Sequence, residues 1–273
     1  MPGPDLRVLG GLEEKLSTIS VIIPAYNEER YLPETIAAVR RAEQYLQEPV
    51  EIIVADNMST DRTAEVAASL GARVVPVEIR CISAVRNRGA SAATGKYLVF
   101  VDADDHMSDN LLKEVKLALD SGRYVGGGVA RTRYDRESLG IRFTHGLVQT
   151  TLSFTGLSMF LFYTTAKAFS DIRGFDEALL CTEDYDFAKR LRAYGRERGQ
   201  RYKNMRSAYL VKSARKFAEF GDWTFLRNPI LSIRAALNHG DTAYELWYKP
   251  RRVPTSSGNE NHRTDAGVCA KEA

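Results

Sequence analysis

The sequence predicts an α/β protein with a doubly wound, mostly parallel β-sheet flanked by helices. Between residues 18 and 104, short apolar segments alternate with segments of helical periodicity, in the order β-α-β-α-β-α-β. The connections between these segments are short, and repeated βα units with short connections form parallel sheets. Such sheets bind ligands at the carboxyl ends of their strands, so we expect the site at that edge.

Apolar, β-branched runs predict the four strands. The first, TISVIIPAY, is apolar throughout and is therefore expected to be buried on both faces, with Pro24 closing it. The strands are expected at 18–26, 50–56, 72–78 and 96–104.

Helical patterns fill the intervals between these strands. Residues 27–46 carry an apolar stripe made by Leu32, Ile36, Val39 and Leu46. A helix at 59–71 is expected to be capped by Ser59 or Thr60 and to end at Gly71. The other helices are expected at 83–95, where Gly95 ends a run of small residues, and at 109–121.

Beyond residue 122 the pattern becomes irregular. We expect a strand entering a loop at 123–134, mixed strand and helix signals at 150–177, and helical periodicity at 222–249. An amphipathic helix at 183–195 should end at Gly195. The chain therefore divides into a flexible lead-in at 1–17, a regular half at 18–122, an irregular half at 123–249 and a disordered tail at 250–273.

The composition argues against several classes of protein. The 273 residues carry a formal net charge of +3, which is too balanced for a dedicated nucleic-acid binder. The three cysteines have neither disulfide nor zinc spacing, so a reducing cytoplasm is the expected compartment. The N-terminal residues lack a signal-peptide apolar region and no stretch is long enough to span a bilayer, while peripheral contact with a membrane remains open.

An acidic turn follows the fourth strand in YLVFVDADDHM, at Asp102, Asp104 and Asp105. Two carboxylates separated by one residue can face one cation, and their oxygens suit Mg²⁺ or Mn²⁺ with a diphosphate completing the coordination. The alternative is a solvated Asp-rich turn in which Ser108 or Asp109 caps the next helix. The D-x-D pattern alone does not decide between them, and His106 is expected to be a loop residue.

Other polar residues fall near the same edge. Asp56 ends the second strand, where it can accept from a nucleobase N–H or a ribose hydroxyl, or form a capping Asx-turn. Arg80, Arg86 and Arg88 lie before or within the helix that precedes the acidic strand. Arginine suits phosphate or base recognition, although one or two of them should be ordinary surface or ion-pair residues.

Two carboxylates, Glu183 and Asp184, open the helix at 183–195, with Thr182 as its expected cap. The helix dipole favours them there, but one could also be a general base for an acceptor hydroxyl. A basic run follows, which could line a diphosphate, meet anionic lipid or form a solvated face. It consists of Arg196, Arg198, Arg201, Lys203, Arg206, Lys212, Arg215 and Lys216.

Five segments in a fixed order carry a resemblance: SVIIPAYNEERYL, EIIVADNMSTDRT, AVRNRGASAATGKYLVFVDADD, RGFDE and EDYDFAKRLRAYG. The set resembles glycosyltransferase family 2, of GT-A fold, over roughly residues 18–216. The resemblance implies an inverting transferase that uses Mg²⁺ or Mn²⁺ and moves a sugar from a nucleotide-diphosphate sugar to a hydroxyl of a glycan or a lipid-linked acceptor. Residues 18–122 would then bind the nucleotide sugar, and 123–249 would bind the acceptor and supply the catalytic base.

The resemblance also implies roles for single residues. The first-strand loop that holds the nucleotide matches Pro24, Ala25, Tyr26 and Glu28. Asp56 matches an aspartate that contacts the base, and Arg80 is a looser match to a base- or phosphate-contacting arginine. Asp102 and Asp104 match the D-x-D motif, with Asp104 the more direct metal ligand and Asp102 facing both metal and nucleotide. Asp184 would be the catalytic base, with Glu183 beside it.

The chain departs from the family pattern in three places. The usual DDGS is DNMS, so Asn57 replaces an aspartate, and the usual double glycine before FDE is Arg173-Gly174. The Q-x-x-R-W signature of processive synthases is missing from the downstream sequence, which favours single addition. The segment at 213–217, SARKF, is expected to close over the diphosphate.

Two other functions fit parts of the sequence. A sugar-phosphate nucleotidyltransferase shares the parallel sheet and an acidic metal site, but it should carry a Gly-rich loop with a lysine after the first strand, and PAYNEER has neither residue. A non-catalytic sugar-nucleotide binding module would be expected to lose the D-x-D or the ED pair, and both are present.

Overall fold

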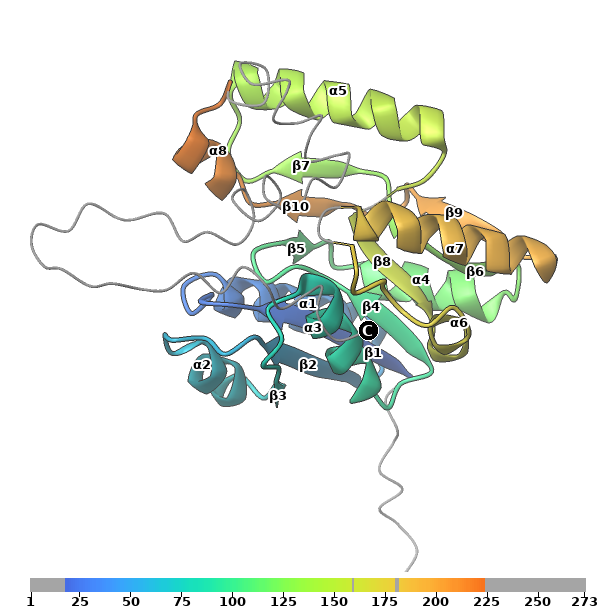
Figure 1. Ribbon diagram of the computed structural model, residues 1–273, viewed down its shortest axis with the longest axis horizontal. Coiled ribbons are helices and arrows are strands. Elements are labelled where there is room, and N and C mark those ends of the chain that lie inside the picture. Colours follow the sequence, from blue (N-terminus) through green and yellow to red (C-terminus); the bar gives the residue numbers. More distant parts are fainter. Residues whose placement is uncertain (1–17, 159, 180–181, 224–273) are drawn as a thin grey trace, which may run out of the picture.

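The computed structural model describes residues 18–158, 160–179 and 182–223. The expected lead-in at 1–17, the tail at 250–273 and nearly all of the helical pattern at 222–249 lie outside these residues and are drawn as a thin grey trace in Figure 1. Within the described residues the chain forms two β-sheets and eight helices. No helix in this part of the chain is long and apolar enough to cross a membrane.

A seven-stranded sheet forms the centre of the molecule (Figure 1). In spatial order its strands are β3 (Arg73–Pro76), β2 (Val50–Asp56), β1 (Ile19–Ala25), β4 (Tyr97–Phe100), β8 (Phe160–Thr165), β6 (Tyr124–Val129) and β9 (Arg201–Met205). Six strands run in one direction, and β8 is antiparallel to both of its neighbours. The predicted α/β fold with a mostly parallel sheet is confirmed, and β8 is the strand hidden in the mixed signals of 150–177.

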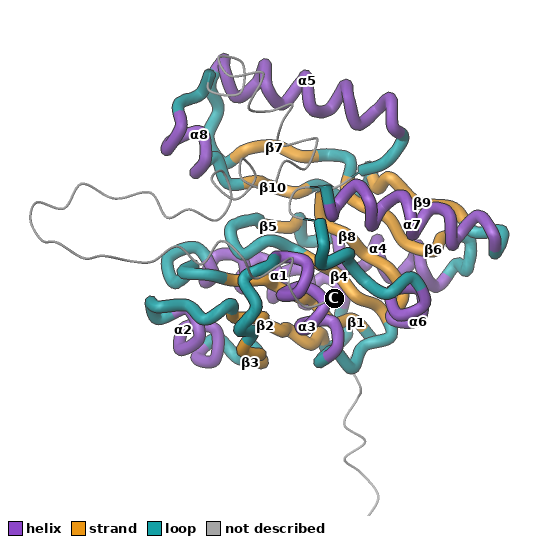
Figure 2. Tube along the Cα trace, in the orientation of Figure 1, coloured by secondary structure: helices purple, strands orange, loops and turns teal. Residues whose placement is uncertain are grey.

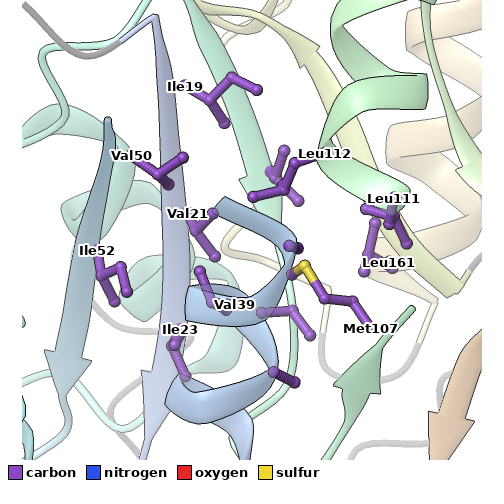
Figure 3. Packing of buried hydrophobic residues seen from close by; sticks show 14 of the residues in the cluster. Ile19, Val21, Ile23, Val39, Val50, Ile52, Met107, Leu111, Leu112 and Leu161 are labelled. Atoms are coloured by element: carbon purple, nitrogen blue, oxygen red, sulfur yellow. The ribbon is translucent and has the colours of Figure 1, made fainter. Parts of the chain in front are cut away.

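Helices cover both faces of this sheet (Figure 2). They are α1 (Leu32–Leu46), α2 (Thr63–Ser69), α3 (Ile82–Ser91), α4 (Leu111–Asp120), α6 (Ala166–Asp171) and α7 (Glu183–Glu197). The other two helices, α5 (Leu139–Thr155) and α8 (Arg215–Phe220), lie away from this sheet. Alternate residues of β1 point to opposite faces of the sheet, as successive side chains in any strand do. Val21 and Ile23 belong to the hydrophobic cluster that includes residues of α1 and α4, such as Val39 and Leu112 in Figure 3. Ile22 belongs to the cluster on the other face, which includes residues of α3, α6 and α7.

A second, three-stranded sheet links distant parts of the chain. β5 (His106–Met107) pairs antiparallel with β10 (Leu210–Lys212), which pairs parallel with β7 (Thr132–Tyr134). α5 and α8 lie beyond this small sheet (Figure 1). The sheet therefore attaches the acidic turn after β4 to the basic segment around residue 212.

Several expected helix starts are wrong because side chains in the preceding loops are used elsewhere. α1 begins at Leu32, with Pro33 in its first turn, rather than at residue 27. The expected caps of α2 are wrong, since the helix begins at Thr63 and Ser59 Oγ donates to Asp56 instead. The helices expected after Ser108 or Asp109 and after Thr182 also lack a side-chain cap hydrogen bond.

Two glycines that were expected to end helices instead lie where the chain packs closely against the sheet. α7 continues to Glu197, and a Cβ on Gly195 would lie 2.6 Å from Cγ1 of Val125 in β6. α3 ends at Ser91, and a Cβ on Gly95 would lie 2.6 Å from Oγ of Ser20. Each glycine therefore lets a helix or loop approach the sheet more closely than a side chain would permit.

In the irregular half, the expected single strand at 123–134 is two strands, β6 and β7, in different sheets. The helix α5 at 139–155 was not expected as such, because its apolar residues run on into those of β8. The fourth strand ends at Phe100 rather than at residue 104, so the whole acidic turn lies in a loop.

Candidate active site

Polar residues gather where the parallel strands end. Asp56 is the last residue of β2 and is in register with Ala25, the last residue of β1. The acidic turn that contains Asp102 and Asp104 follows β4, which is the other neighbour of β1. The sheet thus brings the loop after Pro24, the end of β2 and the D-x-D motif to one edge.

The loop after β1 is held by the loop after β2. Asn27 has a positive φ of 55°, and its side-chain carbonyl accepts from the Thr60 N–H at 2.7 Å. The Glu28 N–H donates to Thr63 Oγ1 at 2.8 Å. These contacts explain why residues 27–31 form a turn rather than the start of α1, and they leave Tyr26 exposed beside Asp56.

Asn57, where the resembling family has an aspartate, has a donor role. Its side-chain amide donates to the carbonyls of Val77 and Ile79 at 2.7 and 2.9 Å. An ionised aspartate has no hydrogen to donate, so asparagine is required for this arrangement. The two bonds hold the chain that leads to Arg80, whose guanidinium carbon lies 5.3 Å from the ring centre of Tyr26.

Each carboxylate of the acidic turn faces a basic side chain. The closest contacts are Arg86–Asp102 at 3.1 Å, Arg215–Asp104 at 3.1 Å and Lys212–Asp105 at 2.6 Å. The side chains of Asp102, Asp104 and Asp105 are 44%, 19% and 3% exposed, respectively. Asp102 and Asp104 are therefore accessible to a ligand, whereas Asp105 supports the turn from within.

The buried pair of Asp105 and Lys212 is strongly coupled. Burial raises the pKa of Asp105 to about 7, although Lys212 acts in the opposite direction. Burial alone would lower the pKa of Lys212, but Asp105 and Asp102 raise it. The lysine is therefore charged at neutral pH and offsets negative charge in the turn.

Arg86 connects the acidic turn with the ED pair at the start of α7. Its Nη1 donates to Asp184 Oδ1 at 2.7 Å and lies 3.7 Å from Glu183 Oε1, while its Nη2 donates to Asp102 Oδ1 at 3.1 Å. The arginine is only 7% exposed. Burial alone would lower the pKa of Arg86, but Asp184, Asp102 and Glu183 raise it.

An aromatic cluster fixes α7 above the sheet. Phe187 of α7 stacks on Phe175 of the RGFDE segment with ring centres 4.2 Å apart. Phe175 also lies edge-on to Phe100, the last residue of β4, at 5.3 Å. This packing places the first turn of α7 beside Arg86 of α3, whose side chain also reaches the loop after β4.

The two carboxylates of the ED pair have different surroundings. Burial, followed by the charge of Asp184, raises the pKa of Glu183 to about 7. Glu183 Oε2 has no hydrogen-bond partner among the described residues. Burial also raises the pKa of Asp184, with Arg86 as the main opposing influence. The Asp184 side chain is 33% exposed, so it is the member of the pair that a ligand can reach.

The basic segment after β10 closes the site from the opposite side. Arg215 donates to both carboxylate oxygens of Glu28, from Nη1 at 2.8 Å and from Nη2 at 3.0 Å. Burial raises the pKa of Glu28, against the opposing effect of Arg215. Arg215 therefore ties α8 to the first-strand loop and to Asp104, in the segment 213–217 that was expected to lie over the diphosphate.

Phosphate contacts were predicted only in general terms for Arg86 and for the basic run that contains Lys212 and Arg215, and the carboxylate partners of these three residues were not predicted. A signal existed for Arg86, which shares the buried small-residue face of α3 with Ser83 and Ala90. A charged residue on such a face needs a partner. The partners of Lys212 and Arg215 gave no local signal, because the positions of these two residues depend on the pairing of β10 with β5.

His106, expected to be a loop residue, instead begins β5 and lies 3.7 Å from Glu34.

A metal site made by protein side chains alone is not found in the described residues, where no group of three or more His, Cys, Asp or Glu side chains is arranged to hold an ion. Asp102 and Asp104 nevertheless offer the oxygen donors that Mg²⁺ and Mn²⁺ prefer. Mg²⁺ commonly uses one or two carboxylates and completes its shell with substrate phosphates and water. The donor set therefore fits a cation shared with a diphosphate.

Curated proteins with similar sequences are glycosyltransferases. The chain is 30% identical over 127 residues to the uncharacterized glycosyltransferase EpsJ of Bacillus subtilis (strain 168), covering 44% of this chain and 36% of EpsJ. It is 26% identical over 191 residues to the poly(ribitol-phosphate) beta-N-acetylglucosaminyltransferase TarS of Staphylococcus aureus (strain Mu50 / ATCC 700699), covering 64% of this chain and 32% of TarS. The matched region thus spans about a third of the length of these relatives.

Solved structures share the fold. TarS 1–349 of S. aureus in complex with UDP-GlcNAc superposes with a TM-score of 0.54 at 20% identity, covering 71% of this chain and 58% of that one. The mannosyltransferase PcManGT from Pyrobaculum calidifontis, in complex with GDP-Man and Mn²⁺, gives a TM-score of 0.59 at 17% identity, with coverages of 87% and 66%. These likenesses show a fold of GT-A type. The family model described as "Glycosyl transferase family 2" matches residues 20–180, more than half of the chain, and the chain therefore belongs to this family.

Proposed function

We propose that this protein transfers a sugar from a nucleotide-diphosphate sugar to an acceptor hydroxyl, with inversion at the anomeric carbon and one sugar added per acceptor. The observation that carries the proposal is the double contact of Arg86 with Asp102 and Asp184. Because a guanidinium is only a few ångströms wide, Asp102 and Asp184 lie close together on either side of it. One donor and one acceptor could therefore contact these two carboxylates at the same time.

The donor would lie across the ends of β1, β2 and β4. Tyr26 and Arg80 form an exposed platform beside Asp56 for the nucleoside, with Pro24 and Ala25 supplying the adjoining backbone. The diphosphate would extend toward Asp102 and Asp104. The complexes of TarS with UDP-GlcNAc and of PcManGT with GDP-Man support a nucleotide-diphosphate sugar as the donor class.

The charge of the site supports dependence on a divalent metal. The six carboxyl groups are Glu28, Asp102, Asp104, Asp105, Glu183 and Asp184, and the three basic side chains are Arg86, Lys212 and Arg215. This excess of acidic groups opposes the entry of a diphosphate. Asp102 and Asp104 would hold Mg²⁺ or Mn²⁺, which supplies charge stabilisation for the departing diphosphate.

Asp184 would act as the base. Its raised pKa makes it a better proton acceptor than an exposed aspartate. It takes the proton of the acceptor hydroxyl while the hydroxyl oxygen forms a bond to the anomeric carbon. The bond from that carbon to the diphosphate oxygen breaks, and its electron pair leaves with the diphosphate. Attack from the face opposite the leaving group inverts the configuration without a covalent intermediate.

We assign residues 18–122 to the donor and the half that begins at residue 123 to the acceptor, which would be a glycan or a lipid-linked sugar. The missing Q-x-x-R-W signature supports single addition. Leu139 and Phe143 are exposed on α5, as is the basic residue Arg142 of the same helix. Apolar and basic side chains on one helix support peripheral contact with a membrane that carries the acceptor.

Two experiments test the proposal. Calorimetry with UDP, GDP and TDP should show binding that Mn²⁺ strengthens, and the lack of metal-enhanced binding for all three would overturn the donor class. Asp184→Asn should lower the turnover of nucleotide-sugar cleavage by about 10²–10⁴-fold. Asp186→Asn is the matched control, because it removes a carboxylate from the same helical turn, where its side chain contacts Arg190 and none of the other residues proposed for the site. Full activity of Asp184→Asn would rule out its role as the base.

A further inference from the structure

We propose that Arg86 is a positioning residue, which fixes the distance between the carboxylate that accepts the proton, Asp184, and the carboxylate on the diphosphate side, Asp102. The proposal rests on the function proposed above, since it takes Asp184 as the base. It adds a residue whose effect on the reaction passes through these two carboxylates.

The geometry of the guanidinium carries this inference. Nη1 and Nη2 diverge from one rigid, planar group, and each donates to a different carboxylate, at 2.7 Å to Asp184 and 3.1 Å to Asp102. These two carboxylates come from different elements, the start of α7 and the loop after β4. A rigid fork that holds both therefore sets their separation.

Arg86 is itself held in place from below. It lies within α3, is 7% exposed, and its guanidinium carbon is 5.1 Å from the ring centre of Phe175. The next residue of α3, Asn87, donates to the Phe175 carbonyl and accepts from the Phe175 N–H, both at 2.9 Å. Helix α3 thus binds the RGFDE segment through Asn87, and the ring of Phe175 in that segment supports Arg86.

The sequence Arg173-Gly174, in place of the usual double glycine, is consistent with this support of Arg86 by Asn87 and Phe175. Gly174 has a φ of +63°, and a Cβ there would lie 2.5 Å from Asn87 Oδ1. The glycine that remains from the usual pair is therefore the one that permits the contact between Asn87 and Phe175.

A role in charge compensation alone makes a different prediction. Lysine would supply the same charge from the same helix, but its single ammonium has no rigid fork. If Arg86 only neutralises the carboxylates, lysine should replace it. If Arg86 sets their separation, lysine should preserve folding and donor binding but not turnover.

The test compares Arg86→Lys with Arg88→Lys, an exposed arginine two residues along α3. For each we would measure the melting temperature, the Kd of a nucleoside diphosphate with Mn²⁺, and kcat and KM for nucleotide-sugar cleavage with water as acceptor. Arg86→Lys should keep Kd and KM within a few-fold of the parent and lose about 100-fold in kcat. Arg88→Lys should match the parent in all four.

A second variant covers the case in which Arg86→Lys does not fold. Phe175→Leu keeps every charge and removes the ring beneath Arg86, so it should lower kcat by about tenfold with Kd unchanged. Parent-like kcat in either folded variant, or a loss confined to Kd, would overturn the positioning role and leave the proposed function standing. A parent protein that cleaves and transfers no nucleotide sugar would instead overturn the proposed function, and the role of Arg86 would fall with it.

Discussion

Replacing Lys212 by methionine tests how the acidic turn is stabilised. The change removes the ammonium that lies 2.6 Å from Asp105, whose side chain is 3% exposed. Methionine has a similar length, so the variant leaves a buried carboxylate without its cation and little change in packing. We expect a loss of stability that grows with pH above neutrality.

The direction of this pH dependence follows from the pKa of Asp105. In the folded protein this pKa is about 7, above the usual value of about 4 for an exposed aspartate. Stability linked to protonated Asp105 is therefore full below pH ~4 and is lost as the pH rises to ~7, which for about three pKa units amounts to about 4 kcal/mol. Removing Lys212 raises the folded pKa further, so the additional loss appears above pH ~7. We expect Lys212→Met to reduce the free energy of unfolding by about 1–2 kcal/mol at pH ~6 and by about 3–5 kcal/mol at pH ~8.5.

Urea denaturation followed by circular dichroism at the two pH values measures these losses. The exposed Lys189→Met in α7 is the control and should change the free energy of unfolding by less than about 0.5 kcal/mol. Adding Asp105→Asn to Lys212→Met removes the uncompensated charge and should recover most of the additional loss at the higher pH. Equal losses at both pH values, or a double variant no more stable than the single one at the higher pH, would refute this reasoning.

Three further predictions follow from other contacts. Asn57→Asp should destabilise the protein by about 2–4 kcal/mol in urea titrations, because the amide that donates to Val77 and Ile79 becomes an acceptor facing two acceptors, and Asn57→Ala should cost less. Gly127→Ala should reduce the free energy of unfolding by about 1–3 kcal/mol, because its Cβ would lie 1.9 Å from the Lys203 carbonyl oxygen across β6 and β9, whereas Gly146→Ala, at a position with nothing within 4 Å, should be neutral or stabilising. Treatment with EDTA should weaken nucleoside diphosphate binding at least about tenfold, with recovery on adding Mn²⁺, and calorimetry that shows equal binding before and after chelation would contradict metal dependence.

The regular half of the fold could be predicted because its signals are local. The run TISVIIPAY becomes β1 within one residue at each end, since a strand buried on both faces is apolar throughout. β8 could not be identified in the same way, because its apolar residues follow those of α5 and its strand character depends on pairing with β4 and β6. A strand defined by tertiary pairing has no hydrophobic periodicity in its sequence that distinguishes it from the neighbouring helix.

The candidate site likewise contains residues that could be located from local sequence patterns and residues whose positions depend on tertiary pairing. Asp56, Asp102 and Asp104 could be located at one edge because each follows a strand whose place in the sheet was predictable. The contact of Arg215 with Glu28 and Asp104 joins residues more than a hundred positions apart and needs the small sheet of β5, β10 and β7. No pattern within either segment contains that information, so the carboxylate partners of Lys212 and Arg215 could not be predicted.

The pairing of β5 with β10 also sets an order of events during synthesis. Asp105 and Lys212 are 107 residues apart, which at about 5–20 residues per second means that the carboxylates leave the ribosome roughly 5–20 s before the lysine. In this interval the nascent chain can pair β1 with β2 and β4 and can place Arg86 beneath the turn. The remaining negative charge then has only dissolved cations as partners. The edge of the sheet that would receive the donor is therefore the last part of this framework to reach its final balance of charge.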